Sequence, residues 1–217
     1  MAPGNPTSTA RGPFTPAVPF LACAMAVGAV LLINGGHDEK PPPQPSAAQA
    51  FSTSADPTHP AVRPLPAADP VRLRIEAIGV NAPMTRVGLD AAGALRTPPP
   101  GQPDHAGWYG DGAVPGSAGT AVATGHVDTP GGRPGVFYNL GALTEGATIE
   151  ISRADRRTAV FSVRAVELYD RKKFPSEKVY GSSGRPELRL ITCGGGYTKR
   201  TGYLGNVVVY ATLTSVR

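Results

Sequence analysis

The feature that most constrains the fold is a series of short apolar segments, separated by clusters of glycine and proline, that runs from residue 71 to the end of the chain. In several segments apolar and polar residues alternate, as in a strand with one buried face. No stretch of ten or more residues has the spacing of an amphipathic helix. Short strands with turn signals between them predict an all-β barrel or sandwich. The expected strands are residues 71–80, 119–126, 147–152, 158–169, 187–193 and 206–213.

The longest of these strands, residues 158–169, changes phase along its length. Phe161, Val163 and Ala165 share one face. From Val166 onward the apolar residues have the opposite parity. Such a change predicts a β-bulge, in which one extra residue is inserted into the strand.

The N-terminal third has a different composition. Residues 14–34 carry no charge and are mostly apolar, and a membrane-spanning helix needs about 20 such residues. We therefore expect a transmembrane signal anchor at 14–34 and a cytoplasmic tail at 1–13. A cleaved signal peptide is the alternative, but no small-residue cleavage site closely follows the apolar core. Arg11 before the span favours a cytoplasmic N-terminus, which predicts a single-pass membrane protein with its folded domain outside the cell.

Residues 35–70 differ from both neighbours. Their last thirty residues contain nine prolines, and a segment of this composition buries too little apolar surface to order itself. It is expected to be a disordered linker. The remaining residues, 71–217, number about 147 and are enough for one hydrophobic core.

Charge and cysteine usage exclude several classes of function. The net charge is +5, but the basic residues are scattered, and the tightest group, residues 171–173, is typical of a solvated turn. Nucleic-acid binding is therefore not expected. Two cysteines and scattered histidines give no metal-ligand spacing. No metal and no cofactor are expected.

A single thiol stands out in the folded part. Cys193 ends the apolar run LITC and is followed by three glycines, whereas Cys23 lies in the expected anchor. Cysteines of exported domains are usually paired, so an unpaired one needs a reason. It is either a small buried apolar residue or a nucleophile, and a nucleophile needs a base or a cation beside it.

The domain offers few partners for such a thiol. His126 ends an expected strand directly after Gly125, whereas His105 lies in a turn-rich segment and is interpreted as a surface residue. Two arginines are candidates for stabilising a developing oxyanion. Arg200 follows Cys193 by seven residues, and Arg189 has the same strand parity as Cys193.

The combination of these features resembles a known family. The stretches that carry the resemblance are VRLRIEAIGVNAP, GHVDTPGGRPGVFYNLGAL, PELRLITCGG and TGYLGNVVVYA. Together they resemble the sortases, membrane-anchored cysteine transpeptidases of Gram-positive cell surfaces, and in particular the actinobacterial sortases called class F. The resemblance covers residues 71–213. It implies a closed barrel of about eight strands.

The resemblance also implies a site made of histidine, cysteine and arginine. It places the nucleophile at Cys193 and the proton donor at His126. The arginine falls on Arg200, with Arg189 as the alternative, although in the best-studied sortases it lies further past the cysteine and leads directly into the last strand. Thr192, Gly194 and Arg189 would contact substrate, and Asp128 could orient the histidine ring.

The implied reaction is acyl transfer. The thiolate attacks the Thr–Gly carbonyl of an LPXTG-like sorting signal in a secreted protein, and an amine of the cell wall or of a surface protein opens the resulting thioester. Two alternatives remain: a thiol hydrolase with the same residues, and a non-catalytic surface domain that binds peptides. Residues 171–187 are either a binding-site loop or a plain surface connection.

Overall fold

The computed structural model describes residues 41–51 and 62–217. The expected tail at 1–13 and anchor at 14–34 lie outside these residues. Among the helices of the described ranges, none has the length and apolar character needed to cross a membrane. Residues 41–217 form one compact unit.

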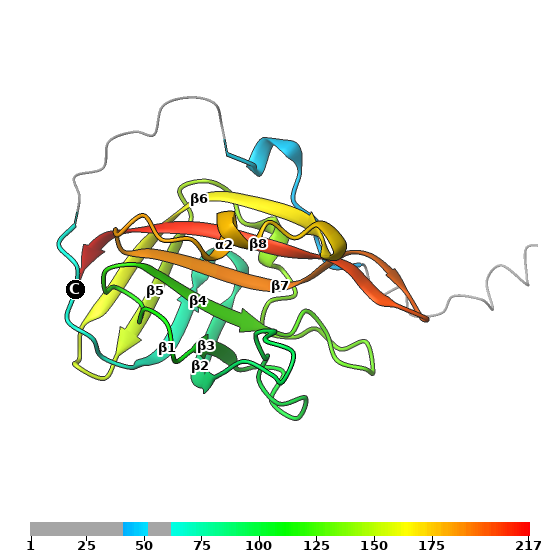
Figure 1. Ribbon diagram of the computed structural model, residues 1–217, viewed down its shortest axis with the longest axis horizontal. Coiled ribbons are helices and arrows are strands. Elements are labelled where there is room, and N and C mark those ends of the chain that lie inside the picture. The colour runs from blue at the N-terminus through cyan, green and yellow to red at the C-terminus, as the bar shows by residue number, and fades with distance from the viewer. Residues whose placement is uncertain (1–40, 52–61) are drawn as a thin grey trace, which may run out of the picture. The chain divides into compact units, whose positions relative to one another are not determined.

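Eight strands close into a barrel in the order β1-β2-β3-β4-β7-β8-β6-β5 (Figure 1). The helical elements of the described residues are short: α2 (Ser176–Tyr180) and four 3-10 turns, η1 (Ala47–Gln49), η2 (Glu76–Ile78), η3 (Leu140–Ala142) and η4 (Arg171–Lys173). The predicted all-β closed barrel is therefore confirmed. Its strands are β1 (Pro70–Ile75), β2 (Val80–Val87), β3 (Ala106–Tyr109), β4 (Thr120–Gly125), β5 (Thr148–Arg153), β6 (Thr158–Asp170), β7 (Glu187–Thr198) and β8 (Gly202–Val216).

Two strand predictions were wrong in detail. The segment 71–80, expected as one strand, is divided between β1 and β2 by η2. Gly79 ends this turn with a left-handed backbone (φ 69°), which glycine adopts without steric cost. β3 was not predicted, because its four residues follow a segment rich in proline and glycine and are too few to show a strand period.

The predicted bulge in β6 is present. The register between β6 and β8 shifts between Val163 and Ala165, one residue earlier than the change of phase suggested. Val163 and Val166 consequently both point into the barrel, whereas Ala165 packs on its outer face. The bulge thus lets one strand serve two apolar layers.

The two apolar layers lie on opposite sides of the barrel wall. The barrel interior holds the main core, in which Leu73, Ile151, Phe161 and Leu190 are fully buried. A smaller cluster lies outside the barrel, where α2 places its buried Val179 on the surface of β4, β7 and β8. This second cluster fixes the connection between β6 and β7 over the outer face of the sheet.

The segment 41–51, called here the strap, packs on the barrel. Gln49 Nε2 donates hydrogen bonds to the carbonyls of Gly141 (2.9 Å) and Leu143 (2.7 Å). Phe51 meets the ring of Tyr210 at 4.9 Å between centroids. The sequence placed these residues in a disordered linker at 35–70, and for the strap the structure corrects that expectation.

The residues just before β1 are also fixed to the barrel. The amide of Leu65 donates to the carbonyl of Gly116 (2.8 Å). The Arg153 guanidinium, which is fully buried, donates to the carbonyl of Pro66. The expected start of the ordered domain at residue 71 is therefore too late by several residues.

Candidate active site

His126 directly follows β4, and Cys193 lies within β7, the parallel neighbour of β4. In the pairing of β4 with β7, Thr124 lies opposite Ile191. The Thr192 hydroxyl extends this contact by donating to the carbonyl of Gly125 (2.8 Å). The printed pairing ends there, and the same register continued by two residues would bring His126 opposite Cys193. Parallel strands are about 4.8 Å apart and opposed residues point to the same side, so both side chains lie on the outer face.

The imidazole of His126 has one fixed hydrogen bond. Its Nε2 lies 2.8 Å from the carbonyl oxygen of Pro98. A carbonyl can only accept, so Nε2 carries the hydrogen and donates it. This contact leaves Nδ1 as the nitrogen that can gain or lose a proton in a reaction.

The Cys193 thiol is free and half-buried. Burial raises the pKa of the thiol above its usual value, because a thiolate loses solvation. The charge and hydrogen bond of the Arg171 guanidinium act in the opposite direction, and the Asp128 carboxylate adds to the increase in this pKa. A cation therefore lies beside the thiol, and it is an arginine that the sequence analysis did not single out.

A groove of about 860 Å³ opens over the thiol. Val122 and Ile191 form part of its floor, and the connection between β6 and β7 supplies one wall. That connection, residues 171–187, therefore lines the groove, as expected for a binding-site loop. It contributes Arg171, Phe174, Ser176, Tyr180 and Ser182 to the lining, and Leu95 and Tyr109 stand on other parts of the wall.

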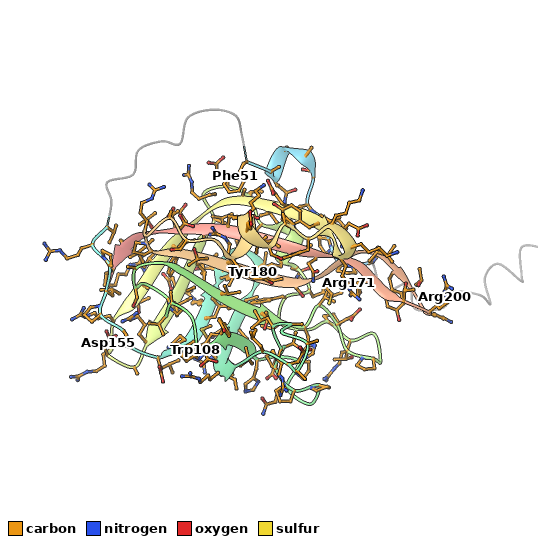
Figure 2. All side chains as sticks on the ribbon, in the orientation of Figure 1. Phe51, Trp108, Asp155, Arg171, Tyr180 and Arg200 are labelled. Atoms are coloured by element: carbon orange, nitrogen blue, oxygen red, sulfur yellow. The ribbon has the colours of Figure 1, made fainter. Side chains whose placement is uncertain are left out.

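Arg200, the arginine expected at the site, lies elsewhere. It is exposed in the turn between β7 and β8, where Thr198 pairs with Gly202. β7 continues from Cys193 to Thr198 before this turn begins, which carries Arg200 away from the thiol. Figure 2 shows Arg200 at the outer tip of this hairpin and Arg171 closer to the barrel.

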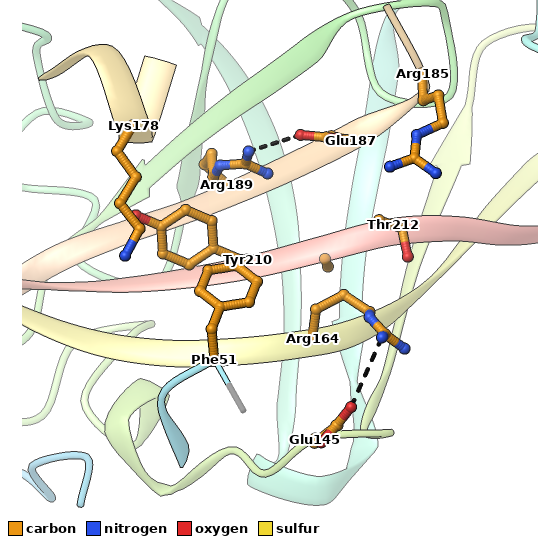
Figure 3. Close-up of a pocket in the computed structure, with 10 residues that line it drawn as sticks. Phe51, Glu145, Arg164, Lys178, Arg185, Glu187, Arg189, Tyr210 and Thr212 are labelled. Atoms are coloured by element: carbon orange, nitrogen blue, oxygen red, sulfur yellow. Dashed lines mark hydrogen bonds and ion pairs between the residues drawn. The ribbon is translucent and has the colours of Figure 1, made fainter. Parts of the chain in front are cut away.

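Arg189, the alternative, faces a different pocket. Its guanidinium donates to the carbonyl of Val179 (3.1 Å), pairs with Glu187 (2.6 Å) and stacks on the ring of Tyr210. This pocket has a volume of about 410 Å³ and contains Arg189 but not Cys193 (Figure 3). The buried Arg189 thus fastens α2 to the sheet.

The remaining expected site residues have contacts of their own. Asp128 accepts a hydrogen bond from the hydroxyl of Tyr203, and in the described residues the ring of His126 is held by Pro98 instead. Thr192 lines the groove, but its hydroxyl joins the two strands. A Cβ on Gly194 would lie 2.7 Å from a methyl carbon of Val207, so this position requires glycine.

No local signal distinguishes Arg171 in the sequence. It belongs to the basic run 171–173, which is typical of a solvated turn. Its proximity to Cys193 arises from strand pairing: β6 pairs with β8, and β8 pairs with β7. Residues 22 positions apart in the sequence meet only after both pairings have formed.

Comparison with known proteins agrees with this fold. Residues 73–214 match the model of the sortase domain family, whereas no curated protein matches the chain. The fold is similar to the SrtA sortase of Actinomyces oris (TM-score 0.52, 20% identity, 77% of this chain and 91% of that one). It is also similar to sortase A of Listeria monocytogenes (TM-score 0.50, 17% identity, 70% and 90%).

A further sortase has the same fold. Sortase C-1 of Actinomyces oris aligns with a TM-score of 0.51 and 21% identity over 68% of this chain and 76% of that one. At these identities the likeness establishes the architecture, and the family assignment comes from the domain match, which covers most of the folded residues. The chain belongs to the sortase family.

Proposed function

We propose that this protein is a cysteine transpeptidase that cleaves a sorting-signal peptide and transfers its acyl part to an amine. The observation that supports the proposal is the parallel pairing of β4 with β7, whose register, continued past Thr124 and Ile191, would bring His126 opposite Cys193 on the outer face. A nucleophile and a proton donor on rigid neighbouring strands can keep a fixed separation during a reaction.

The proposed reaction has two stages. The Cys193 thiolate attacks the scissile carbonyl carbon, and the carbonyl π electrons move to oxygen. When this tetrahedral species collapses, the C–N bond breaks and His126 gives a proton to the departing amine. An incoming amine then attacks the thioester, transfers a proton to His126 and releases the thiolate.

The groove supports a peptide substrate of largely apolar character. Its floor and walls carry Val122, Ile191, Leu95 and Phe174, which favour aliphatic side chains next to the bond that is cleaved. We therefore infer an LPXTG-like signal as the substrate class. The uncharged residues 14–34 support a location in the cell membrane with the domain outside, and the quoted motifs support class F.

The test uses the full-length protein in mild detergent. It is incubated with a library of LPXTG-type peptides and triglycine, and the products and the intact enzyme are analysed by mass spectrometry. We expect peptides joined to triglycine and an acyl adduct on Cys193. Cys193→Ala should abolish both, and Cys23→Ala is the matched control that should change neither.

Two other outcomes would contradict the proposal. Cleavage that depends on Cys193 but never joins the peptide to triglycine or to another supplied amine would establish a hydrolase. Peptide binding that is equal in the wild-type protein and in Cys193→Ala, without any adduct, would establish a binding domain.

A further inference from the structure

On the β8 side, the strand neighbours of Cys193 carry no positive charge. Across the β7–β8 pairing, Cys193 lies opposite Asn206, and across the β8–β6 pairing Asn206 lies opposite Tyr169. Asn206 is neutral and donates a long hydrogen bond to the carbonyl of Thr192 (3.4 Å). A cation on this side of the thiol therefore has to come from beyond these paired residues.

The end of β6 supplies one. Asp170 pairs with Gly205, and Gly205 pairs with Gly194, the residue after the nucleophile. Arg171 follows Asp170 directly and begins η4. The Asp170 carboxylate accepts a hydrogen bond from the amide of Lys172 (2.7 Å), which fixes the start of this turn. Arg171 is thereby held at the edge of the groove, two residues beyond the row formed by Cys193, Asn206 and Tyr169.

The guanidinium of Arg171 is available for the site. Within the described residues, no ion pair joins it to a carboxylate, whereas Asp128, the acidic group near the thiol, is bound by the Tyr203 hydroxyl. Arg171 lines the same groove as Cys193, Thr192 and Asn206. Its positive charge favours the thiolate and lowers the pKa of the thiol.

We propose that Arg171, rather than Arg200 or Arg189, is the catalytic cation of this protein. This inference rests on the proposed transpeptidase function. Arg171 holds the thiolate of Cys193 before the reaction. When sulfur attacks the carbonyl carbon, negative charge moves to the carbonyl oxygen, and the same guanidinium stabilises that oxyanion. Arg171 keeps all its protons throughout, and the proton for the leaving amine comes from His126.

The two roles predict different effects on rate. Removal of one donor to an oxyanion typically lowers kcat by about 10²–10³-fold. Loss of the cation beside the sulfur also raises the thiol pKa, which lowers the thiolate fraction at neutral pH. Among the described residues, the other titratable groups that act on Cys193 or line its groove are Asp128, Tyr203, Tyr109 and Tyr180. These groups, and His126 after the neighbouring strand, are unchanged when only Arg171 is replaced.

The test compares Arg171→Ala and Arg171→Lys with Arg200→Ala, each as the full-length protein with Cys23→Ala as background. Arg200→Ala is the matched control because it removes the same charge from an exposed turn. Circular dichroism checks that each variant folds. The first measurement is the rate of Cys193 alkylation by iodoacetamide against pH, which needs no peptide substrate. The second is kcat for peptide transfer to triglycine.

For Arg171→Ala we expect the alkylation midpoint to move to higher pH and kcat to fall by about 10²-fold. Arg171→Lys should leave the alkylation midpoint close to that of the background, because the positive charge is retained. Its kcat should fall only in part. Arg200→Ala should match the background in both. The proposal is overturned if Arg171→Ala keeps the background midpoint, or if Arg200→Ala shows the loss instead. If instead the proposed transpeptidase function is wrong, the background protein also gives no transfer to triglycine. The shift of the alkylation midpoint in Arg171→Ala is then still observed.

Discussion

At the residue scale, the reactivity of Cys193 depends on two groups of opposite charge, the guanidinium of Arg171 and the carboxylate of Asp128. The guanidinium of Arg171 lowers the energy of the thiolate, whereas burial and the carboxylate of Asp128 raise it. Asp128 itself is held in place by Tyr203, whose hydroxyl pKa is raised by burial and by this hydrogen bond. Because that phenol stays protonated, it remains a donor to the carboxylate at neutral pH.

A substitution of Asp128 should therefore increase thiol reactivity. In Asp128→Asn the negative charge that raises the thiol pKa is gone, so the midpoint of alkylation by iodoacetamide should move to lower pH. The reactive form is the thiolate, and alkylation at pH 7 should accordingly become faster, by up to about 10-fold for a shift of one pKa unit. Asp111→Asn is the control, since this exposed carboxylate pairs with Arg86. A midpoint that is unchanged or higher would contradict the assignment.

At the scale of elements, the strap connects the barrel to the part of the chain that precedes it. Gln44 accepts a hydrogen bond from the amide of Gly195 (2.7 Å), two residues after Cys193. Gln49 holds η3 through the carbonyls of Gly141 and Leu143. The strap therefore stabilises both the barrel and the glycine segment beside the thiol.

Removing the amide of Gln49 should lower the free energy of unfolding. Gln49→Ala leaves two partly buried carbonyls without their donor, which costs about 1–3 kcal/mol. Urea unfolding followed by circular dichroism measures this loss. Gln102→Ala is the control, because Gln102 is exposed, and we expect a change within about 0.5 kcal/mol for it. Equal stability of the two variants would mean that the strap does not stabilise the barrel.

At the scale of the whole molecule, one core supports all eight strands. The chain closes the barrel when β1 pairs with β5 as well as with β2. Interior side chains such as Phe161 and Leu190 come from strands far apart in the sequence and belong to one cluster. A domain built in this way is expected to unfold in a single cooperative transition.

Phe161→Ala should test this cooperativity. A cavity at a fully buried phenylalanine lowers the free energy of unfolding by about 3–5 kcal/mol. The far-UV circular dichroism signal and the fluorescence of Trp108, the single tryptophan, should shift together to lower denaturant. Leu168→Ala, on the same strand but 41% exposed, should change stability by about 0.5 kcal/mol or less. Separate transitions for the two signals would contradict a single core.

The sequence by itself determined the properties whose signals are local. Alternating polarity predicted the all-β architecture and most strands, because side chains of a strand point to opposite faces with a period of two residues. The lone thiol, the histidine that follows Gly125 and the family motifs were also visible there. The separation of the folded part from residues 14–34 followed from composition.

Only the tertiary structure decided which groups meet. Arg171 lies beside Cys193 because β8 pairs with both β6 and β7, and no spacing along the chain encodes that register. Proximity in sequence favoured Arg200 instead, but the long β7–β8 hairpin carries it away from the thiol. The strap was missed for a similar reason. Its composition is typical of disorder, whereas its stability comes from a few hydrogen bonds to carbonyls that exist in place only after the barrel has folded.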